Sequence, residues 1–175
     1  PYLVVFGVLI GCIAGSKYVY EMIKGRVKPN KITWLIWGMA PIIGGWAMLS
    51  EGFTWNAVPV ISAGVWPLII FILASFMPQA YWKLKTFDYV CGVFSLLAII
   101  LWQITNIALW AVILTVLADL LAGLPTITKT WKFPETESFW PFLTPIFSNG
   151  VVLLAMSQWS LLEGLFPLYL LVFCI

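Results

Sequence analysis

Asp119 is the residue whose type and position point most directly to chemistry, because it is the one acidic side chain well inside a long apolar segment. No lysine or arginine is expected at its depth, so its carboxylate lacks a partner charge. A carboxyl group in such surroundings takes up a proton, hydrogen-bonds a hydroxyl or amine of a solute, or ties its helix to a neighbouring helix. The sequence leaves these three roles open.

Other polar side chains inside apolar segments complete a candidate binding set. Asn149 can both donate and accept hydrogen bonds, as a hydroxyl-rich solute requires. Polar groups at membrane depth usually face a cavity or a partner helix. A tryptophan such as Trp66 can line a cavity, although several of the 11 tryptophans fall near segment ends, where indoles favour lipid headgroups. The candidate solute-binding residues are Asp119, Asn149, Ser148, Trp66 and Ser62.

Several kinds of chemistry are excluded by the residue types. The chain has no histidine, so histidine acid–base catalysis is impossible and no Cys/His zinc site can form. Cys12, Cys91 and Cys174 all fall in apolar segments, where a free cysteine behaves as a small apolar residue. No paired acids or nucleophile–base pair are found either. We therefore expect a protein that is not an enzyme and uses no metal and no cofactor.

The elements that position these residues are predicted to be membrane-spanning helices. The chain is 62% hydrophobic and 9% charged, whereas soluble domains carry roughly 25% charged residues. Lipid accepts only helices or closed barrels, and these segments lack the alternation of barrel strands. A spanning helix needs about 20 mostly apolar residues. We predict seven helices, near 2–20, 32–49, 58–77, 89–104, 107–127, 140–156 and 161–175.

The positive charges predict an orientation. All nine lysines and arginines lie in or beside the connections that follow the first, third and fifth apolar segments. The positive-inside rule places these connections in the cytoplasm, so we expect the N-terminus to lie outside the cell and the C-terminus to lie in the cytoplasm. The expected membrane is a bacterial inner membrane or a plasma membrane. Lys17 and Glu21 are expected to pair at this end. The residues expected to cap the sixth helix are Glu135, Thr136, Glu137 and Ser138.

The chain contains a weak internal repeat. An offset of 105 residues pairs Lys24 with Lys129, and an offset of 104 pairs Pro41 with Pro145. Each copy has a helix, a positively charged connection and a second helix with an internal proline. Helices one and five start on the same side of the membrane, so the two copies are parallel. One additional helix between them must therefore reverse the direction of the chain. The predicted units are 1–77 and 106–175, each of three helices, and 78–105, which holds the linker helix and its cytoplasmic connection.

This 3+1+3 arrangement resembles the SWEET and PQ-loop family of small-solute transporters. The resemblance covers nearly the whole chain and is carried by "KPNKITW" at 28–34, "PTITK" at 125–129, Pro41 and Pro145. The literal dipeptide Pro78-Gln79 stands at the end of the third segment, where the family does not place it. The resemblance implies two parallel three-helix bundles that carry a small polar solute, a sugar first of all, by alternating access.

The resemblance also implies hinge residues near a cytoplasmic gate. The family has prolines there in helices 1, 2, 5 and 6, and Tyr20 takes the helix-one place here. A proline inside a helix frees a carbonyl four residues earlier and kinks the axis, so a static kink is the alternative to a hinge. Lys129 and Lys132 are expected to be anchoring charges beyond the hinge of helix five. The implied gate and hinge residues are Tyr20, Pro41, Pro125 and Pro145.

Two alternatives to a sugar transporter stay open. A Pnu-type vitamin or nucleoside carrier has a related fold, and "WLIW" at 34–37 is similar to a Trp-x-x-Trp element in that family. A non-transporting receptor of the same architecture would need a charged outer cavity, for which the outward connections offer only Glu51 and Glu163. The expected partners are a small-molecule solute and the lipid bilayer, with no nucleic acid. A homo-oligomer is also possible.

Overall fold

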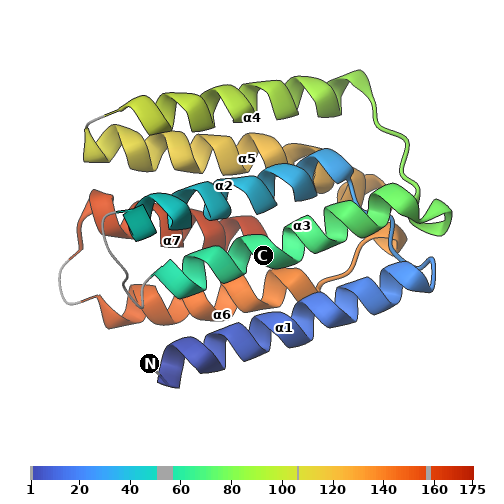
Figure 1. Ribbon diagram of the computed structural model, residues 1–175, viewed down its shortest axis with the longest axis horizontal. Coiled ribbons are helices and arrows are strands. Elements are labelled where there is room, and N and C mark those ends of the chain that lie inside the picture. The colour runs from blue at the N-terminus through green and yellow to red at the C-terminus, as the bar shows by residue number, and fades with distance from the viewer. Residues whose placement is uncertain (1, 51–56, 106, 157–158) are drawn as a thin grey trace.

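The computed structural model describes residues 2–50, 57–105, 107–156 and 159–175. Within these ranges the chain forms seven α-helices and two short 3-10 helices, with no strand (Figure 1). The predicted all-helical fold is confirmed, and each predicted segment coincides with one helix. The α-helices are α1 (Tyr2–Ile23), α2 (Lys31–Ser50), α3 (Ala57–Phe76), α4 (Thr86–Ile104), α5 (Ala108–Lys132), α6 (Trp140–Ala155) and α7 (Leu161–Cys174), and the 3-10 helices are η1 (Pro78–Ala80) and η2 (Pro134–Thr136).

The α1–α2 connection shows how the sequence ends one helix and starts the next. Gly25 has a φ of 69°, a left-handed conformation that costs glycine little, and its N–H donates to the Met22 carbonyl at 2.9 Å. The side-chain oxygen of Asn30 then accepts a hydrogen bond from the Ile32 N–H at 3.1 Å, which caps α2. This short connection makes the two helices antiparallel.

The helices pack in the same order in two groups. In the first group α3 packs against both α1 and α2, whereas the described backbones of α1 and α2 do not approach closely, and these two helices meet through the rings of Tyr18 and Trp34 at a centroid distance of 4.8 Å. In the second group α7 packs against both α5 and α6, and the described backbones of α5 and α6 likewise do not approach closely. The third helix of each group therefore lies between the first and the second.

Contacts between the groups are reciprocal. Helix α1 packs on α6, and α2 packs on α5. The remaining helix, α4, packs along α5 and also touches α2 (Figure 1). Small residues permit the closest packing, which is between α2 and α3: a Cβ on Gly64 would lie 2.6 Å from the Gly38 carbonyl oxygen.

One end of the bundle holds the α1–α2, α3–α4 and α5–α6 connections (right in Figure 1). Since all nine lysines and arginines lie in or beside these three connections, we call this end the positive end. The opposite end contains the starts of α5 and α7, so residues early in those helices lie far from the positive charges.

Helix length alone does not establish seven membrane spans. In the described part of the chain, Thr86–Ile104 and Leu109–Lys132 are long and apolar enough to cross a membrane, by length and composition. Further helices are apolar but shorter, namely Val60–Phe76, Trp140–Leu154 and Glu163–Cys174.

Candidate functional site

Asp119 lies where α2, α5 and α7 meet. The hydroxyl of Tyr169 on α7 donates a hydrogen bond to Asp119 Oδ2 at 2.8 Å. The indole N–H of Trp37 on α2 faces the backbone carbonyl of Asp119 at 3.4 Å. Asp119 therefore joins α5 to α7 within the second group through its side chain, and its backbone is in contact with the first group.

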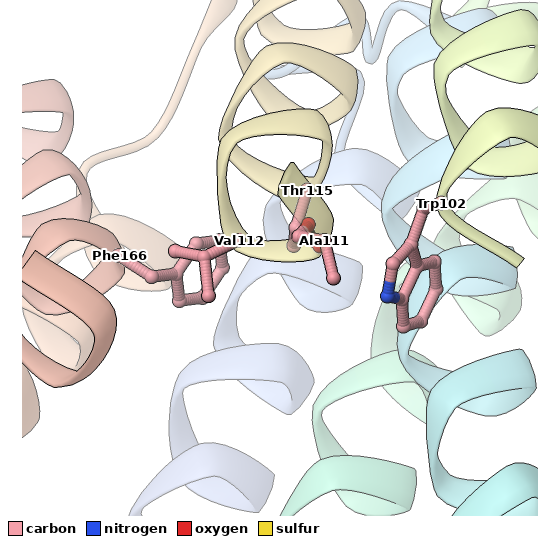
Figure 2. A pocket seen from close by; sticks show the side chains of 5 residues that line it. All are labelled: Trp102, Ala111, Val112, Thr115 and Phe166. Atoms are coloured by element: carbon pink, nitrogen blue, oxygen red, sulfur yellow. Dashed lines mark hydrogen bonds between the residues drawn. The ribbon is translucent and has the colours of Figure 1, made fainter. Parts of the chain in front are cut away.

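A cavity of about 250 Å³ lies next to this pair, and Figure 2 shows Trp102 of α4 and Phe166 of α7 on either side of three α5 side chains. Thr115 precedes Asp119 by four residues, so both lie on one face of α5, one turn apart. Phe166 precedes Tyr169 by three residues, and their ring centroids are 6.1 Å apart. The cavity thus lies one turn from the Asp119–Tyr169 pair, on the side away from the positive end. We call it the Trp102 cavity; it is lined by Trp102, Ala111, Val112, Thr115 and Phe166.

Aromatic rings fill the other side of Asp119, towards the positive end. Trp37 makes edge-to-face contacts with Trp34, Phe142 and Phe173, at centroid distances of 5.6, 6.1 and 5.8 Å. Gly123 on α5 leaves room for them, since a Cβ there would lie 3.0 Å from Trp37 Cζ2. The rings come from α2, α6 and α7, so they close the space between the two groups.

The positive end itself is closed around a buried ammonium group. Lys129 Nζ lies 2.6 Å from Glu137 Oε2, and the two side chains are only 1% and 2% exposed. The ammonium also donates to the carbonyls of Lys28, at 2.7 Å, and Thr136, at 3.2 Å. A lysine ammonium has three donors, so all three are used. The buried charge is therefore both neutralised and fully hydrogen-bonded.

Further hydrogen bonds join the two groups at this point. The hydroxyl of Tyr18 on α1 donates to Glu137 Oε1 at 2.5 Å, and the Lys28 N–H donates to the Thr136 carbonyl at 2.9 Å. The α1–α2 and α5–α6 connections thus lie side by side. The ring of Trp82, from the α3–α4 connection, lies 5.3 Å from Lys129 Nζ. We call Tyr18, Lys28, Lys129, Thr136 and Glu137 the Lys129 cluster.

Sequence reasoning missed this cluster. Lys129 was predicted to be an anchoring charge beyond the hinge and Glu137 to cap α6, but their side chains are buried against each other. A signal was present in the spacing, because Asp119, Thr126 and Lys129 follow one another at seven and three residues and so share one face of α5. A lysine on the same face as the buried acid is expected to point inward as well.

Two threonines lie beneath the Lys129 cluster. Thr33 on α2 donates to the Ala122 carbonyl at 2.7 Å, and the Thr126 hydroxyl donates to Thr33 Oγ1 at 2.9 Å. Both threonines are buried, and Pro125 beside them is fully buried. These bonds again join the first group to the second.

The other predicted binding residues lie apart from Asp119. Asn149 Nδ2 and Ser148 Oγ both donate to the Pro145 carbonyl within α6, at 2.8 and 3.4 Å. Trp66 packs against Gly15 between α3 and α1, and Ser62 is half-buried on α3. None of these four residues lines the Trp102 cavity, and Asp119 does not line it either but lies one helical turn from Thr115, which does.

The predicted gate residues occupy three kinds of surroundings. Pro125 is buried beside the Thr33–Thr126 contact, Pro41 and Pro145 are partly buried within α2 and α6, and Tyr20 is exposed. The structure adds two further prolines inside helices, Pro67 in α3 and Pro167 in α7, which the sequence analysis did not single out.

The predicted Lys17–Glu21 pair is wrong, because the ion pair found among the described residues is Lys129–Glu137. The Lys17 ammonium instead lies over the rings of Tyr20 and Trp140, at 5.5 and 6.0 Å from their centroids. The predicted outward acid Glu51 lies outside the described residues.

A second cavity, of about 350 Å³, lies between α5, α6 and α7 at the positive end. Glu137 and Ser138 contribute polar groups to its wall, and Phe139, Phe142 and Cys174 contribute apolar ones. Because Glu137 also belongs to the Lys129 cluster, this cavity borders the closed end of the seam between the groups.

No protein-family model, curated protein or solved structure matches the chain. Among the described residues, no three histidine, cysteine, aspartate or glutamate side chains come together in a group that could hold a metal ion.

Proposed function

We propose that this protein is a membrane carrier that moves a small polar solute by alternating access between two three-helix groups, α1–α3 and α5–α7. The observation that carries the proposal is the repeated packing order together with the reciprocal contacts, α1 on α6 and α2 on α5. Exchanging the two groups turns one contact into the other, as a two-fold axis along the bundle would. Parallel repeats about such an axis are one of the arrangements that secondary transporters use.

A membrane location is supported by the surface of the molecule. Large apolar side chains such as Val93, Phe94 and Ile100 are about half exposed along α4. A water-soluble monomer rarely exposes a continuous apolar surface of this kind. In the proposed arrangement all seven helices span the bilayer, α4 reverses the direction between the groups, and the positive end faces the cytoplasm. The chain then starts outside and ends in the cytoplasm.

The two ends of the molecule differ. Away from the positive end, the Trp102 cavity lies between α4, α5 and α7, and none of its five lining residues comes from α1–α3, whereas aromatic rings and the Lys129 cluster close the seam at the positive end. This closure supports a state that is closed towards the cytoplasm. Pro41, Pro125 and Pro145 are the hinge positions in this proposal.

The solute class follows from the size and lining of the Trp102 cavity. Its volume, about 250 Å³, is below the usual range of roughly 300–1,000 Å³ for drug-sized ligands, so the solute is small. Trp102 and Phe166 offer ring faces and Thr115 offers a hydroxyl group, while Asp119 lies one helical turn beyond this lining. A small uncharged ring with hydroxyl groups suits this lining, and the resemblance to the SWEET and PQ-loop family makes a sugar the first solute to test.

Uptake into liposomes tests the proposal. The purified protein is reconstituted and given labelled monosaccharides, vitamins and amino acids, with and without a pH gradient. We expect saturable uptake of at least one monosaccharide above that of empty liposomes, and a loss of most of this uptake in Thr115→Val, which keeps the side-chain shape. Leu154→Ala, at an exposed position on α6, serves as the control. Absence of uptake for the whole panel contradicts the proposed function.

A further inference from the structure

We infer that the Lys129 cluster is the gate of this carrier at the positive end, and that the gate opens with its ion pair intact. The inference rests on the proposed function and concerns the way in which the two groups separate. Lys129 and Glu137 both belong to the second group, because one lies on α5 and the other in the α5–α6 connection. Separating the groups therefore does not separate the two charges.

Within the cluster, three hydrogen bonds cross between the groups. Tyr18 donates to Glu137, the Lys129 ammonium donates to the Lys28 carbonyl, and the Lys28 N–H donates to the Thr136 carbonyl. Breaking these three hydrogen bonds opens the cluster, and water can replace each of them once it enters. Pulling apart a buried ion pair would instead leave an uncompensated charge, which is far more costly. The cluster thus combines a tight closure with a small barrier to opening.

The ion pair nevertheless sets the strength of the closure. The carboxylate of Glu137 makes the bond from Tyr18 charge-assisted, and the ammonium does the same for the bond to the Lys28 carbonyl. Trp82 covers the ammonium from the α3–α4 connection, and its ring contacts Phe133 at a centroid distance of 5.7 Å. Opening therefore also requires Trp82 to move away, which couples the connection that leads into α4 to the gate.

Access of a reagent to Thr126 measures the gate directly. Thr126 is 3% exposed and lies one turn before Lys129 on α5. In a background with Cys12, Cys91 and Cys174 replaced by alanine, Thr126→Cys is labelled with a membrane-impermeant methanethiosulfonate in vesicles that expose the positive end. No solute is added. We expect Tyr18→Phe to raise the labelling rate about tenfold, which corresponds to about 1.4 kcal/mol.

Matched variants separate the gate from general loosening. Tyr89→Phe removes an exposed tyrosine hydroxyl on α4, away from the cluster, and Lys132→Met and Glu135→Gln remove exposed charges near the cluster. None of these should change the labelling rate by more than twofold. Where Tyr18→Phe does not give a monodisperse protein, Trp82→Leu provides the second test, and it too should raise the rate.

The same assay tests the contribution of the ion pair to the closure. Glu137→Gln removes the charge but keeps an oxygen that can accept from Tyr18, and it should raise the labelling rate at least as much as Tyr18→Phe. Equal labelling rates in all of these variants would overturn the gate. Because no solute is present, faster labelling without any uptake would contradict the proposed function alone, and uptake with unchanged labelling would contradict the gate alone.

Discussion

At the scale of single residues, Asp119 is tied to Tyr169 by a hydrogen bond while it lies one turn from the Trp102 cavity. Interhelical hydrogen bonds at membrane depth stabilise a protein by about 0.6 kcal/mol on average and by at most about 1.7 kcal/mol in measured cases. This bond is therefore too weak to be the main support of the α5–α7 contact. In the proposed carrier, Asp119 exchanges Tyr169 for a hydroxyl group of the solute.

A double-mutant cycle tests this view of the pair. Asp119→Asn and Tyr169→Phe should show a coupling free energy of unfolding of about 1 kcal/mol, because they remove the same bond. In the liposome assay Asp119→Asn should lower uptake about tenfold, whereas Tyr169→Phe should lower it less than threefold. Unfolding of the protein in mixed micelles and initial uptake rates provide the two measurements. Equal uptake in both variants would mean that Asp119 serves only to link α5 and α7.

The sequence singles out Asp119 but not the residues that Asp119 and Lys129 contact. Asp119 stands out because it is the acid inside an apolar segment, and that selection needs no structure. Its partner Tyr169 does not stand out, because α7 is apolar on every side beyond Glu163 in its first turn, and its sequence does not fix which face turns towards α5. Lys129 was misplaced because a lysine in the last turn of a helix is usually solvated; its spacing from Asp119 indicated the inward face, but its partner Glu137 is visible only in the structure.

At the scale of helices, length and apolar content predict the elements well. Each predicted segment corresponds to a helix, and the largest difference is at the end of α5, which continues through the charged residues to Lys132. The packing order within each group could not be predicted, since neighbours in sequence usually pack together. Here the described backbones of α1 and α2 do not approach closely, and α3 packs against both helices.

A glycine comparison tests the packing of α5 against α7. A Cβ at Gly123 would collide with Phe173 and would lie 3.0 Å from Trp37 Cζ2, whereas a Cβ at Gly150 on α6 would have no neighbour within 4 Å. Gly123→Ala should lower the free energy of unfolding by about 1–3 kcal/mol, as overpacking does. Gly150→Ala should leave it unchanged or raise it by up to about 1 kcal/mol, because alanine favours the helix.

The unfolding midpoint of each variant in detergent micelles checks both values. Similar destabilisation by the two alanines would show that the close contact of α5 with Phe173 and Trp37 does not contribute to stability. If Gly123→Ala were stable and showed normal uptake, the contacts among Trp37 and its neighbouring rings would contribute neither to stability nor to transport.

At the scale of the whole molecule, the parallel repeat is the prediction from sequence that matters most for function. The sequence offered a drifting offset of 104 to 105 residues and the distribution of nine positive charges. The reciprocal contacts of α1 with α6 and of α2 with α5 add a geometric reason to treat the groups as two moving halves. If they do move, a covalent bond between them must stop transport.

Thr33 and Thr126 provide the place for such a bond. They lie on α2 and α5, one in each group, and their hydroxyl oxygens are 2.9 Å apart, so two thiols at these positions can meet with little movement of the backbone. In a background without the natural cysteines, the Thr33→Cys/Thr126→Cys protein should form a disulfide on mild oxidation and lose more than nine-tenths of its uptake. Reduction should restore uptake, and each single variant should be insensitive to oxidation.

Binding of solute from the outside should persist in the oxidised protein, because the bond holds the positive end closed and leaves the Trp102 cavity unchanged. Full uptake by the oxidised, cross-linked protein would show that the two groups do not move apart at this end, and alternating access between them would then be wrong.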